Sequence, residues 1–406
     1  MADKLVSVCI NSYNSSKYIL NTINSVINQS YKNLQIIVLD DCSTDNTVEL
    51  IKSIKDDRIE IHSTYTNSFY TYAYNESLKY VKGEYVARLD ADDMWEVDKI
   101  KKQVQFLEEN KEYGACFTHV TVIDENSCSF GEALQPLRDV FDFDNCPQHK
   151  MYRHFYDRSN RLCHSSSLIR TEVIKKVGDY DVSLFNLHDF DYWMRLITFC
   201  PIYIITEPLT LYRSGGASSD NSSERWTAHH TEWVRVIYRS INMCPDELFL
   251  KAFADKLKLS GEHTHKETEI EKALLLLEGP IMYKSNPVLG LYKFAELFRD
   301  EEYIKLAKEK FNFSTKDLYK IQEKRCYIDI GEYNHLVGTN KNLDFAVNEQ
   351  KRLNEQANEE LARCAKYIND LEKTRENLEE HIRALENSAS WRITKPIRKI
   401  KALFRK

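Results

Sequence analysis

Three aspartates lie within four positions in the stretch YVARLDADDMW, residues 85–95, where an apolar run ends. Hard divalent cations take oxygen ligands and are commonly shared between carboxylates and the phosphates of a substrate. Asp90, Asp92 and Asp93 could therefore hold such an ion. Aspartate is also favoured in turns and at helix N-termini, so the same stretch is compatible with a solvated turn that caps a helix starting near Glu96.

A second acidic pair, Asp40 and Asp41, closes another apolar run, LQIIVLD. Strand patterns at 5–10, 34–40, 59–64 and 85–90 alternate with helical spacing at 18–30, 46–54 and 73–81. This alternation predicts an α/β fold with a mostly parallel sheet, in which ligands bind at the carboxyl ends of the strands. Both acidic clusters should then share one rim, where their mutual repulsion requires a cation or hydrogen-bond donors. A nucleoside diphosphate with its metal ion would account for both clusters, because one carboxylate can accept hydrogen bonds from the base or ribose and another can bind the ion.

Two stretches carry a family resemblance: VSVCINSYNSSKYILNTINSVINQSYKNLQIIVLDDCSTDNT and NESLKYVKGEYVARLDADDMWEVDKIKKQ. They resemble the start of family 2 of the bacterial inverting glycosyltransferases, whose nucleotide-binding fold is called GT-A. The resemblance spans roughly residues 5–215, and DDCSTD followed by DADD is its specific part. It implies a divalent cofactor, Mn²⁺ or Mg²⁺. It also implies site residues: Asp41 with Asp40 at the base, Asp90 at the ribose or metal, Asp92 at the metal, and Asn11, Tyr13 and Asn14 lining the base pocket.

One segment departs from the family pattern. TNSFYTYAYNES has Phe69 near a position that is often glycine and Tyr74 where arginine is common. The resemblance therefore leaves the donor sugar undefined. Tyr70, Tyr72 and Tyr74 are interpreted as packing aromatics.

The stretch KKVGDYDVSLFNLHDFDYWMRLITF, residues 175–199, places His188, Asp189 and Asp191 at a predicted helix start. Helix capping explains one acid here. The pattern D-x-D-x-W-x-R is also found in the family, and the resemblance implies that Asp189 is the general base. A positioned base contributes about 10²–10⁴ in rate. A single displacement would invert the anomeric configuration. His188 is interpreted as a capping or packing residue.

The segment TLYRSGGASSD, residues 210–220, resembles the flexible loop that closes over the diphosphate in this family. Arg213 could meet phosphate oxygens there. Family members often have a histidine in this loop as a further metal ligand, and this chain has none. His229 and His230 could substitute for it or belong to a solvated helix start. The histidines at 119, 149, 154 and 164 lack metal-ligand spacing and are interpreted as surface or core residues.

The second half of the chain has helical spacing and then changes in character. We expect a GT-A domain over 1–222, a helical domain over 223–340, a coiled coil over 341–389 and a basic amphipathic tail over 390–406. The seam of the coiled coil favours a homo-oligomer, with packing onto its own body as the alternative. Residues 391–406 contain seven Lys or Arg and no acid, which suits an anionic membrane surface.

Composition narrows the class of protein. Ten cysteines without a C-x-x-C pair, and a start without a signal-peptide pattern, indicate a reduced cytoplasmic protein without a structural zinc site. The net charge of −6 argues against general nucleic-acid binding.

We therefore expect an inverting, metal-dependent glycosyltransferase that moves a sugar from a nucleotide-diphosphate donor to a glycan hydroxyl. Its acceptor would be a lipid-linked glycan, and the protein would lie on the inner face of the cytoplasmic membrane. It would take part in the assembly of a capsule or an O-antigen type of polysaccharide. The alternatives are a nucleotidyltransferase, although CINSYNSSKY lacks the glycines of its phosphate loop, and a non-catalytic coiled-coil assembly subunit.

Overall fold

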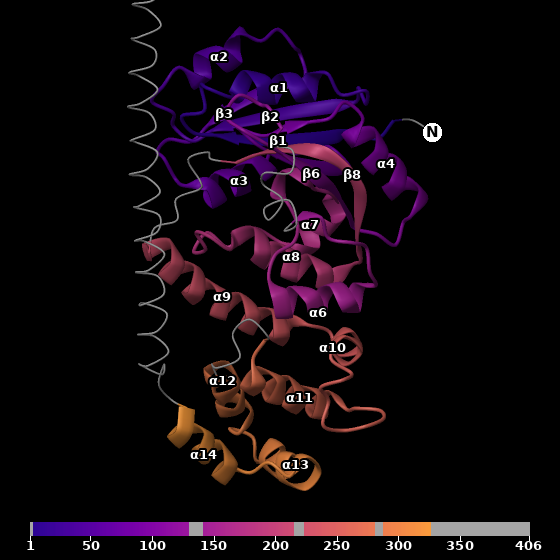
Figure 1. Cartoon of the computed structure of the whole chain (residues 1–406), viewed down its shortest axis with the longest axis vertical. Coiled ribbons are helices and arrows are strands. Elements are labelled where there is room, and N and C mark those ends of the chain that lie inside the picture. The colour runs from indigo at the N-terminus through magenta and orange to yellow at the C-terminus, as the bar shows by residue number, and fades with distance from the viewer. Residues whose placement is uncertain (1–2, 130–140, 215–222, 281–286, 326–406) are drawn as a thin grey trace, which may run out of the picture. The chain divides into compact units, whose positions relative to one another are not determined.

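The computed structural model describes residues 3–129, 141–214, 223–280 and 287–325 (Figure 1). Contacts divide the chain into two compact units, residues 1–326 and 327–406. The predicted coiled coil and basic tail lie outside the described residues. No helix in the described part is both long and apolar enough to span a membrane.

The first unit is built on a mixed eight-stranded sheet with the order β3-β2-β1-β4-β7-β6-β8-β5. The first four strands in this order are parallel to one another, and β7 joins them antiparallel. The parallel part confirms the alternation of strands and helices predicted from the sequence. The strands are β1 (Val6–Ser12), β2 (Leu34–Asp40), β3 (Ile59–Ser63), β4 (Tyr85–Asp90), β5 (Met94–Trp95), β6 (Ala115–Ile123), β7 (Leu168–Arg170) and β8 (Ile202–Arg213).

Helices cover both faces of the sheet. They are α1 (Ile19–Ile27), α2 (Thr47–Ser53), α3 (Tyr70–Leu78), α4 (Lys99–Glu109), α6 (Gln148–Arg158), α7 (Thr171–Val177) and α8 (His188–Phe199), with a short 3₁₀ turn η2 (His164–Ser166). Val8 and Ile36 pack on the side of α1 and α4, while Cys9 and Ile37 pack on the side of α3, α6 and α8. Because successive strand residues point to opposite faces, β1 and β2 are buried along their whole length.

Three predicted helices have different boundaries in the structure, and the first of them, predicted over 18–30, ends at Ile27. Helix α4 begins at Lys99 instead of near Glu96. The reason is that Met94 and Trp95 pair with β8 as a short strand, and the Glu96 N–H donates to the Leu209 carbonyl at 3.0 Å. Helix α3 spans Tyr70–Leu78, three residues earlier than the predicted 73–81.

In the part of the chain that the structure describes, six helices follow β8, as the helical spacing predicted: α9 (Ser223–Met243), α10 (Asp246–Ala252), α11 (His265–Glu278), α12 (Val288–Leu297), α13 (Glu301–Phe311) and α14 (Thr315–Arg325). Trp233 and Ile237 of α9 and Phe249 of α10 share one hydrophobic cluster with α8. A smaller cluster joins Ile270 of α11 to Phe294 of α12. The first of these helices therefore extend the core on the α8 side of the sheet. The boundary of a separate helical domain stays a prediction.

Candidate functional site

The carboxyl ends of three neighbouring parallel strands form the rim of the candidate site. The register pairs Ser12 of β1 with Asp40 of β2, and Asn11 of β1 with Asp90 of β4. Asp41 follows Asp40 directly, and its N–H donates to the Ser12 carbonyl at 2.8 Å. The two acidic stretches therefore do lie along the same edge of the sheet, on either side of β1.

The turn after β4 contains three carboxylates with different surroundings. Asp90 accepts hydrogen bonds from the Tyr70 hydroxyl at 2.5 Å and from an Arg88 N–H at 2.7 Å. Asp92 is half-buried and receives no hydrogen bond from another side chain among the described residues. Burial, followed by repulsion from Asp90, raises the pKa of Asp92 to about 6.

Asp93 is the innermost of the three. It accepts hydrogen bonds from the Ser165 hydroxyl at 2.5 Å and from the Arg213 backbone N–H at 2.7 Å. Burial raises the pKa of Asp93 well above its ordinary value, and the charges of Asp92 and Asp90 add to this effect. Carboxylates that repel one another in this way are stabilised by a cation. The donor set therefore fits a divalent ion, with Asp92 and Asp90 as the side chains that would hold it.

Arg213 holds the acidic turn in place through a hydrogen bond to its backbone. Its Nε donates to the Asp92 carbonyl at 2.7 Å, and its other nitrogens donate to the Asp124 carbonyl and the Ser127 hydroxyl. The side chain is buried and lies over the Tyr18 ring. In this conformation Arg213 positions the turn. Its predicted contact with phosphate stays a prediction.

The loop after β2 is ordered by the other acidic pair. Asp40 accepts hydrogen bonds from the Ser43 N–H at 2.9 Å and the Ser43 hydroxyl at 2.5 Å. Asp41 accepts from the Thr64 hydroxyl at 2.7 Å and the Ser68 N–H at 3.0 Å. Asn14, at φ 47°, accepts from the Thr44 N–H at 2.8 Å. Asp40 and Asn14 therefore hold the loop that follows β2 in place.

Asn11 is an unsatisfied polar group at the end of β1. Its side chain is 7% exposed, and neither the amide nitrogen nor the amide oxygen has a hydrogen-bond partner among the described residues. Buried polar groups are normally paired, so an orphaned amide at a strand end is available to a ligand that offers both a donor and an acceptor. Tyr13, two residues on, is half exposed and can lie against such a ligand.

Asp189 lies in the first turn of α8. Its carboxylate accepts hydrogen bonds from the Asn160 amide at 2.8 Å and from the Phe190 N–H at 2.6 Å. Burial raises the pKa of Asp189, the charge of Asp90 adds to the rise, and His188 and Arg88 oppose it. Asp191 differs, because it pairs with Arg195 at 2.8 Å and Arg239 at 3.0 Å. Among the residues that the structure describes, Asp189 forms no ion pair with a basic side chain, in contrast to Asp191.

Glu232 of α9 supplies the cap that precedes α8. Its carboxylate accepts hydrogen bonds from the backbone N–H groups of Phe185 at 2.7 Å, Asn186 at 2.8 Å and Leu187 at 2.9 Å. Glu232 therefore fixes the turn that leads into α8, while Asp189 accepts the Phe190 N–H inside the first turn of the helix. His188 turns its Nδ1 toward the Phe185 carbonyl at 3.2 Å.

Sequence reasoning missed the buried centre between these carboxylates. The Arg88 guanidinium lies over the Tyr70 and Tyr74 rings, 4.4 and 4.2 Å from their centroids, and its Nε and Nη1 have no hydrogen-bond partner in the described structure. His164 lies 2.9 Å from the Tyr180 hydroxyl and 3.4 Å from the Tyr70 hydroxyl. One signal was present: an arginine that follows three buried residues of the strand YVARLD needs a charged partner, and Asp90 stands two residues later.

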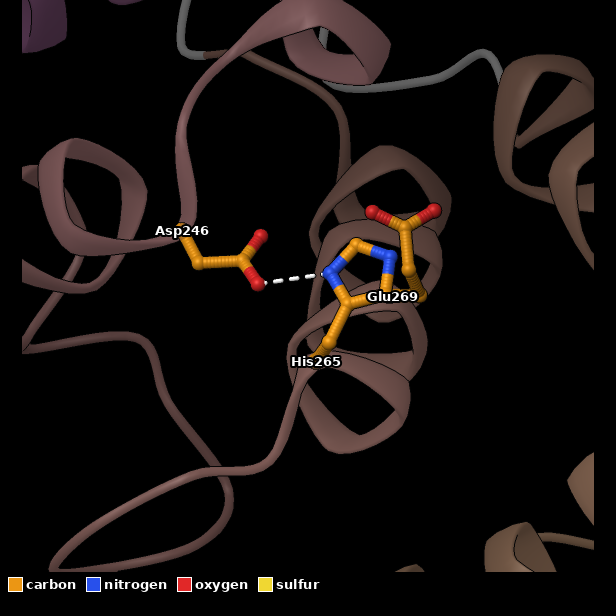
Figure 2. A group of neighbouring side chains, drawn as sticks. All are labelled: Asp246, His265 and Glu269. Carbon is orange, nitrogen blue, oxygen red and sulfur yellow. Dashed lines mark hydrogen bonds and ion pairs between the residues drawn. The ribbon is translucent and has the colours of Figure 1, made fainter.

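A second acidic cluster lies away from the rim, in the helices that follow β8 (Figure 2). Asp246 Oδ2 lies 2.6 Å from His265 Nδ1, and Glu269 is close by. The Lys272 ammonium donates to Glu269 at 2.9 Å and to Asp246 at 3.2 Å, and Lys293 also pairs with Glu269. Because the two ammonium groups already neutralise the carboxylates, we interpret this cluster as an ion-pair network.

Comparison with known proteins places the rim in a family. The model of Glycosyl transferase family 2 matches residues 7–178, from β1 through α7. An uncharacterized glycosyltransferase of Haemophilus influenzae is 27% identical over 318 residues, which are 75% of this chain and 96% of that protein.

Two further relatives match more closely over shorter segments. WfaP of Escherichia coli, a UDP-Glc:alpha-D-GlcNAc-diphosphoundecaprenol beta-1,3-glucosyltransferase, is 44% identical over 109 residues, 27% of this chain and 43% of WfaP. The putative teichuronic acid biosynthesis glycosyltransferase TuaG of Bacillus subtilis is 42% identical over 107 residues, 26% of this chain and 42% of TuaG. These two matches span less than half of each relative.

Among solved structures, residues 1–349 of S. aureus TarS in complex with UDP align with 72% of this chain and 91% of that one, at 18% identity and a TM-score of 0.48. The family match begins at β1 and includes both acidic stretches of the rim. Residues 7–178 therefore contain a domain of glycosyl transferase family 2, an α/β domain of the GT-A type.

Proposed function

We propose that this chain transfers a sugar from a nucleotide-diphosphate donor to a hydroxyl group of a glycan, with inversion at the anomeric carbon. The observation that carries the proposal is that two different carboxylate sites lie near each other, the acidic turn of Asp90 and Asp92 and the carboxylate of Asp189. The charge of Asp90 acts on both Asp92 and Asp189. The acidic turn supports a cation, and Asp189, whose pKa is raised in part by Asp90, supports proton transfer.

The donor would bind along the rim. The unpaired amide of Asn11 suits the edge of a base, and Asp41 could accept hydrogen bonds from the base as its loop rearranges around it. Asp90 and Asp92 would hold Mn²⁺ or Mg²⁺. When bound, such an ion supplies Lewis-acid stabilisation of the departing diphosphate. The name of WfaP includes UDP-Glc, which favours UDP among the possible donor nucleotides.

Asp189 would remove the proton of the attacking hydroxyl. A sugar hydroxyl is a weak nucleophile at neutral pH, and a base works best when its pKa lies close to the operating pH. The raised pKa of Asp189 moves this carboxylate in that direction. Its hydrogen bond from Asn160 fixes one oxygen, and the direct displacement that follows leaves no covalent intermediate.

The acceptor would be a lipid-linked glycan of bacterial surface polysaccharide synthesis. The printed names of WfaP and TuaG, which contain diphosphoundecaprenol and teichuronic acid, support this class. The predicted membrane contact of 391–406 and the predicted homo-oligomer through 341–389 would keep the chain at the inner face of the membrane.

Calorimetry tests the donor half of the proposal. The full chain is titrated with UDP, GDP, dTDP and CMP, each with and without Mn²⁺. We expect metal-dependent binding of one nucleoside diphosphate, weakened at least about tenfold in Asp92→Asn, which corresponds to about 1.4 kcal/mol. Asp246→Asn, in the second acidic cluster, is the matched control and should bind like the wild type. If none of the nucleotides binds, the non-catalytic assembly subunit becomes the better reading.

A further inference from the structure

Phe69 adopts a backbone conformation that phenylalanine rarely tolerates. It lies at φ 64° and ψ 158°, a region that is essentially restricted to glycine. Its side chain is nevertheless 67% exposed, so burial of the ring does not repay the strain. An exposed, strained aromatic residue immediately before α3 indicates a role other than stabilising the fold.

Phe185, in the turn before α8, is in ring contact with Phe69. The two rings pack edge to face with centroids 6.3 Å apart, and Phe185 is 51% exposed. The backbone at Phe185 is held by Glu232, whose carboxylate binds three consecutive N–H groups of this turn. The Phe185 ring is therefore presented on a fixed support.

The two phenylalanines lie next to the residues proposed to bind the metal ion and to act as the base. Phe69 precedes Tyr70, whose hydroxyl donates to Asp90 at 2.5 Å. The Phe185 carbonyl contacts His188, and Asp189 follows His188 directly. The Tyr70 and His188 rings lie 4.9 Å apart, so the segments that carry the two phenylalanines meet at the rim.

We propose that Phe69 and Phe185 form an aromatic platform that binds a sugar ring of the acceptor. The apolar C–H face of the sugar would lie against the face of one ring, the other ring, at 81° to the first, would border it, and one hydroxyl would point toward Asp189. The surface of two rings is far too small for a stable protein–protein interface, so we expect a small ligand. The polar groups of His188 and Asp189 lie beside the rings and suit a ligand that is apolar on one face and polar at its edge. This inference rests on the proposed function, because it names the acceptor side of the same site.

Saturation-transfer NMR tests the platform without requiring turnover. The full chain is mixed with millimolar methyl α- and β-glycosides of glucose, galactose, N-acetylglucosamine and N-acetylgalactosamine. We expect at least one of them to bind the wild type and to lose most of its signal in Phe185→Ala and in Phe69→Gly. Phe199→Ala, at the other end of α8 and 47% exposed, is the matched control and should retain the signal. Absence of binding to the wild type, or equal binding in both platform variants, would overturn the proposal.

Thermal unfolding distinguishes a role in binding from a role in stability, because the two roles predict opposite changes in Tm for Phe69→Gly. Glycine accepts the backbone angles of Phe69, so Phe69→Gly should raise Tm by a few degrees while sugar binding falls. A lower Tm in Phe69→Gly would show that the ring stabilises the fold and would count against the platform. Nucleotide binding in both variants should equal that of the wild type. Failure of the wild type to bind any nucleotide would instead overturn the proposed function, and with it the acceptor role of the platform.

Discussion

The two acidic clusters of this protein both contain carboxylates, but the negative charge is neutralised to different degrees. In the helical cluster, Glu269 pairs with Lys272 and Lys293. In the rim cluster, Asp90 has one arginine, and Asp92 has no side-chain donor among the described residues. The helical cluster is complete without a ligand, whereas the rim cluster is under-compensated.

The pKa directions express the same difference. Burial would raise the pKa of Glu269, but hydrogen bonds and charge from Lys293 and Lys272 outweigh it, and the net pKa is lowered. Burial and the neighbouring Asp90 raise the pKa of Asp92 to about 6. A buried acid with a lowered pKa indicates a satisfied structural pair, and one with a raised pKa indicates a group that lacks its partner.

Asp189→Asn is the change with the largest expected effect on catalysis. Asparagine keeps an oxygen for the Asn160 amide but cannot accept a proton, so kcat should fall by about 10²–10⁴ with nucleotide binding intact. Asp191→Asn is the control on the same helix. It weakens the pairs with Arg195 and Arg239 and should lower Tm more than it lowers kcat. Wild-type turnover in Asp189→Asn would remove Asp189 as the base.

Lys272→Met is the corresponding change in the helical cluster. It removes an ammonium group from two carboxylates and leaves buried charge behind, which typically costs about 3–5 kcal/mol. We expect this loss in the free energy of unfolding, measured with urea, and unchanged nucleotide affinity in the folded protein. Lys251→Met, an exposed lysine paired with Glu247 on α10, should change stability by less than about 1 kcal/mol. Equal stability of Lys272→Met and the wild type would contradict the ion-pair interpretation.

The sequence predicted the parallel half of the sheet and the shared rim, because strand periodicity and the position of acids at strand ends follow from local pattern. It did not predict the distinct surroundings of neighbouring acids. Asp92 and Asp93 are adjacent, yet Asp93 is fixed by Ser165 and the Arg213 N–H, both far away in the chain. Such partners depend on how β8 and η2 pack against the turn, which no local pattern records.

The same limit explains Arg88, Glu232 and Phe69. Arg88 becomes informative only once α3 places two tyrosine rings against it. Glu232 caps a turn more than forty residues earlier in the chain. The positive φ of Phe69 was hinted at by the glycine that the family often has there, but strain is a property of the backbone and not of the residue type.

The pH dependence of stability gives the smallest expected effect and contrasts the two clusters directly. In the metal-free protein, the folded state keeps the Asp92 proton up to a pH of about 6, while the unfolded chain has lost it by then. The folded state thus binds more protons, so this group makes stability fall as pH rises from 5 to 7. Glu269 has the opposite sign, because its lowered pKa makes stability fall only as pH drops below the ordinary glutamate range, near about 4.3.

Thermal unfolding in EDTA at pH 5 and pH 7 measures this contrast. Asp92→Asn should raise Tm by a few degrees at pH 7, where it removes a repelled charge, and by clearly less at pH 5, where the folded wild type still binds the proton. Mn²⁺ at pH 7 should stabilise the wild type and not the variant, because the ion then takes the place of the proton. Equal Tm shifts at both pH values would show that Asp92 is ordinarily solvated, and would place the rim in the same class as a simple acidic turn.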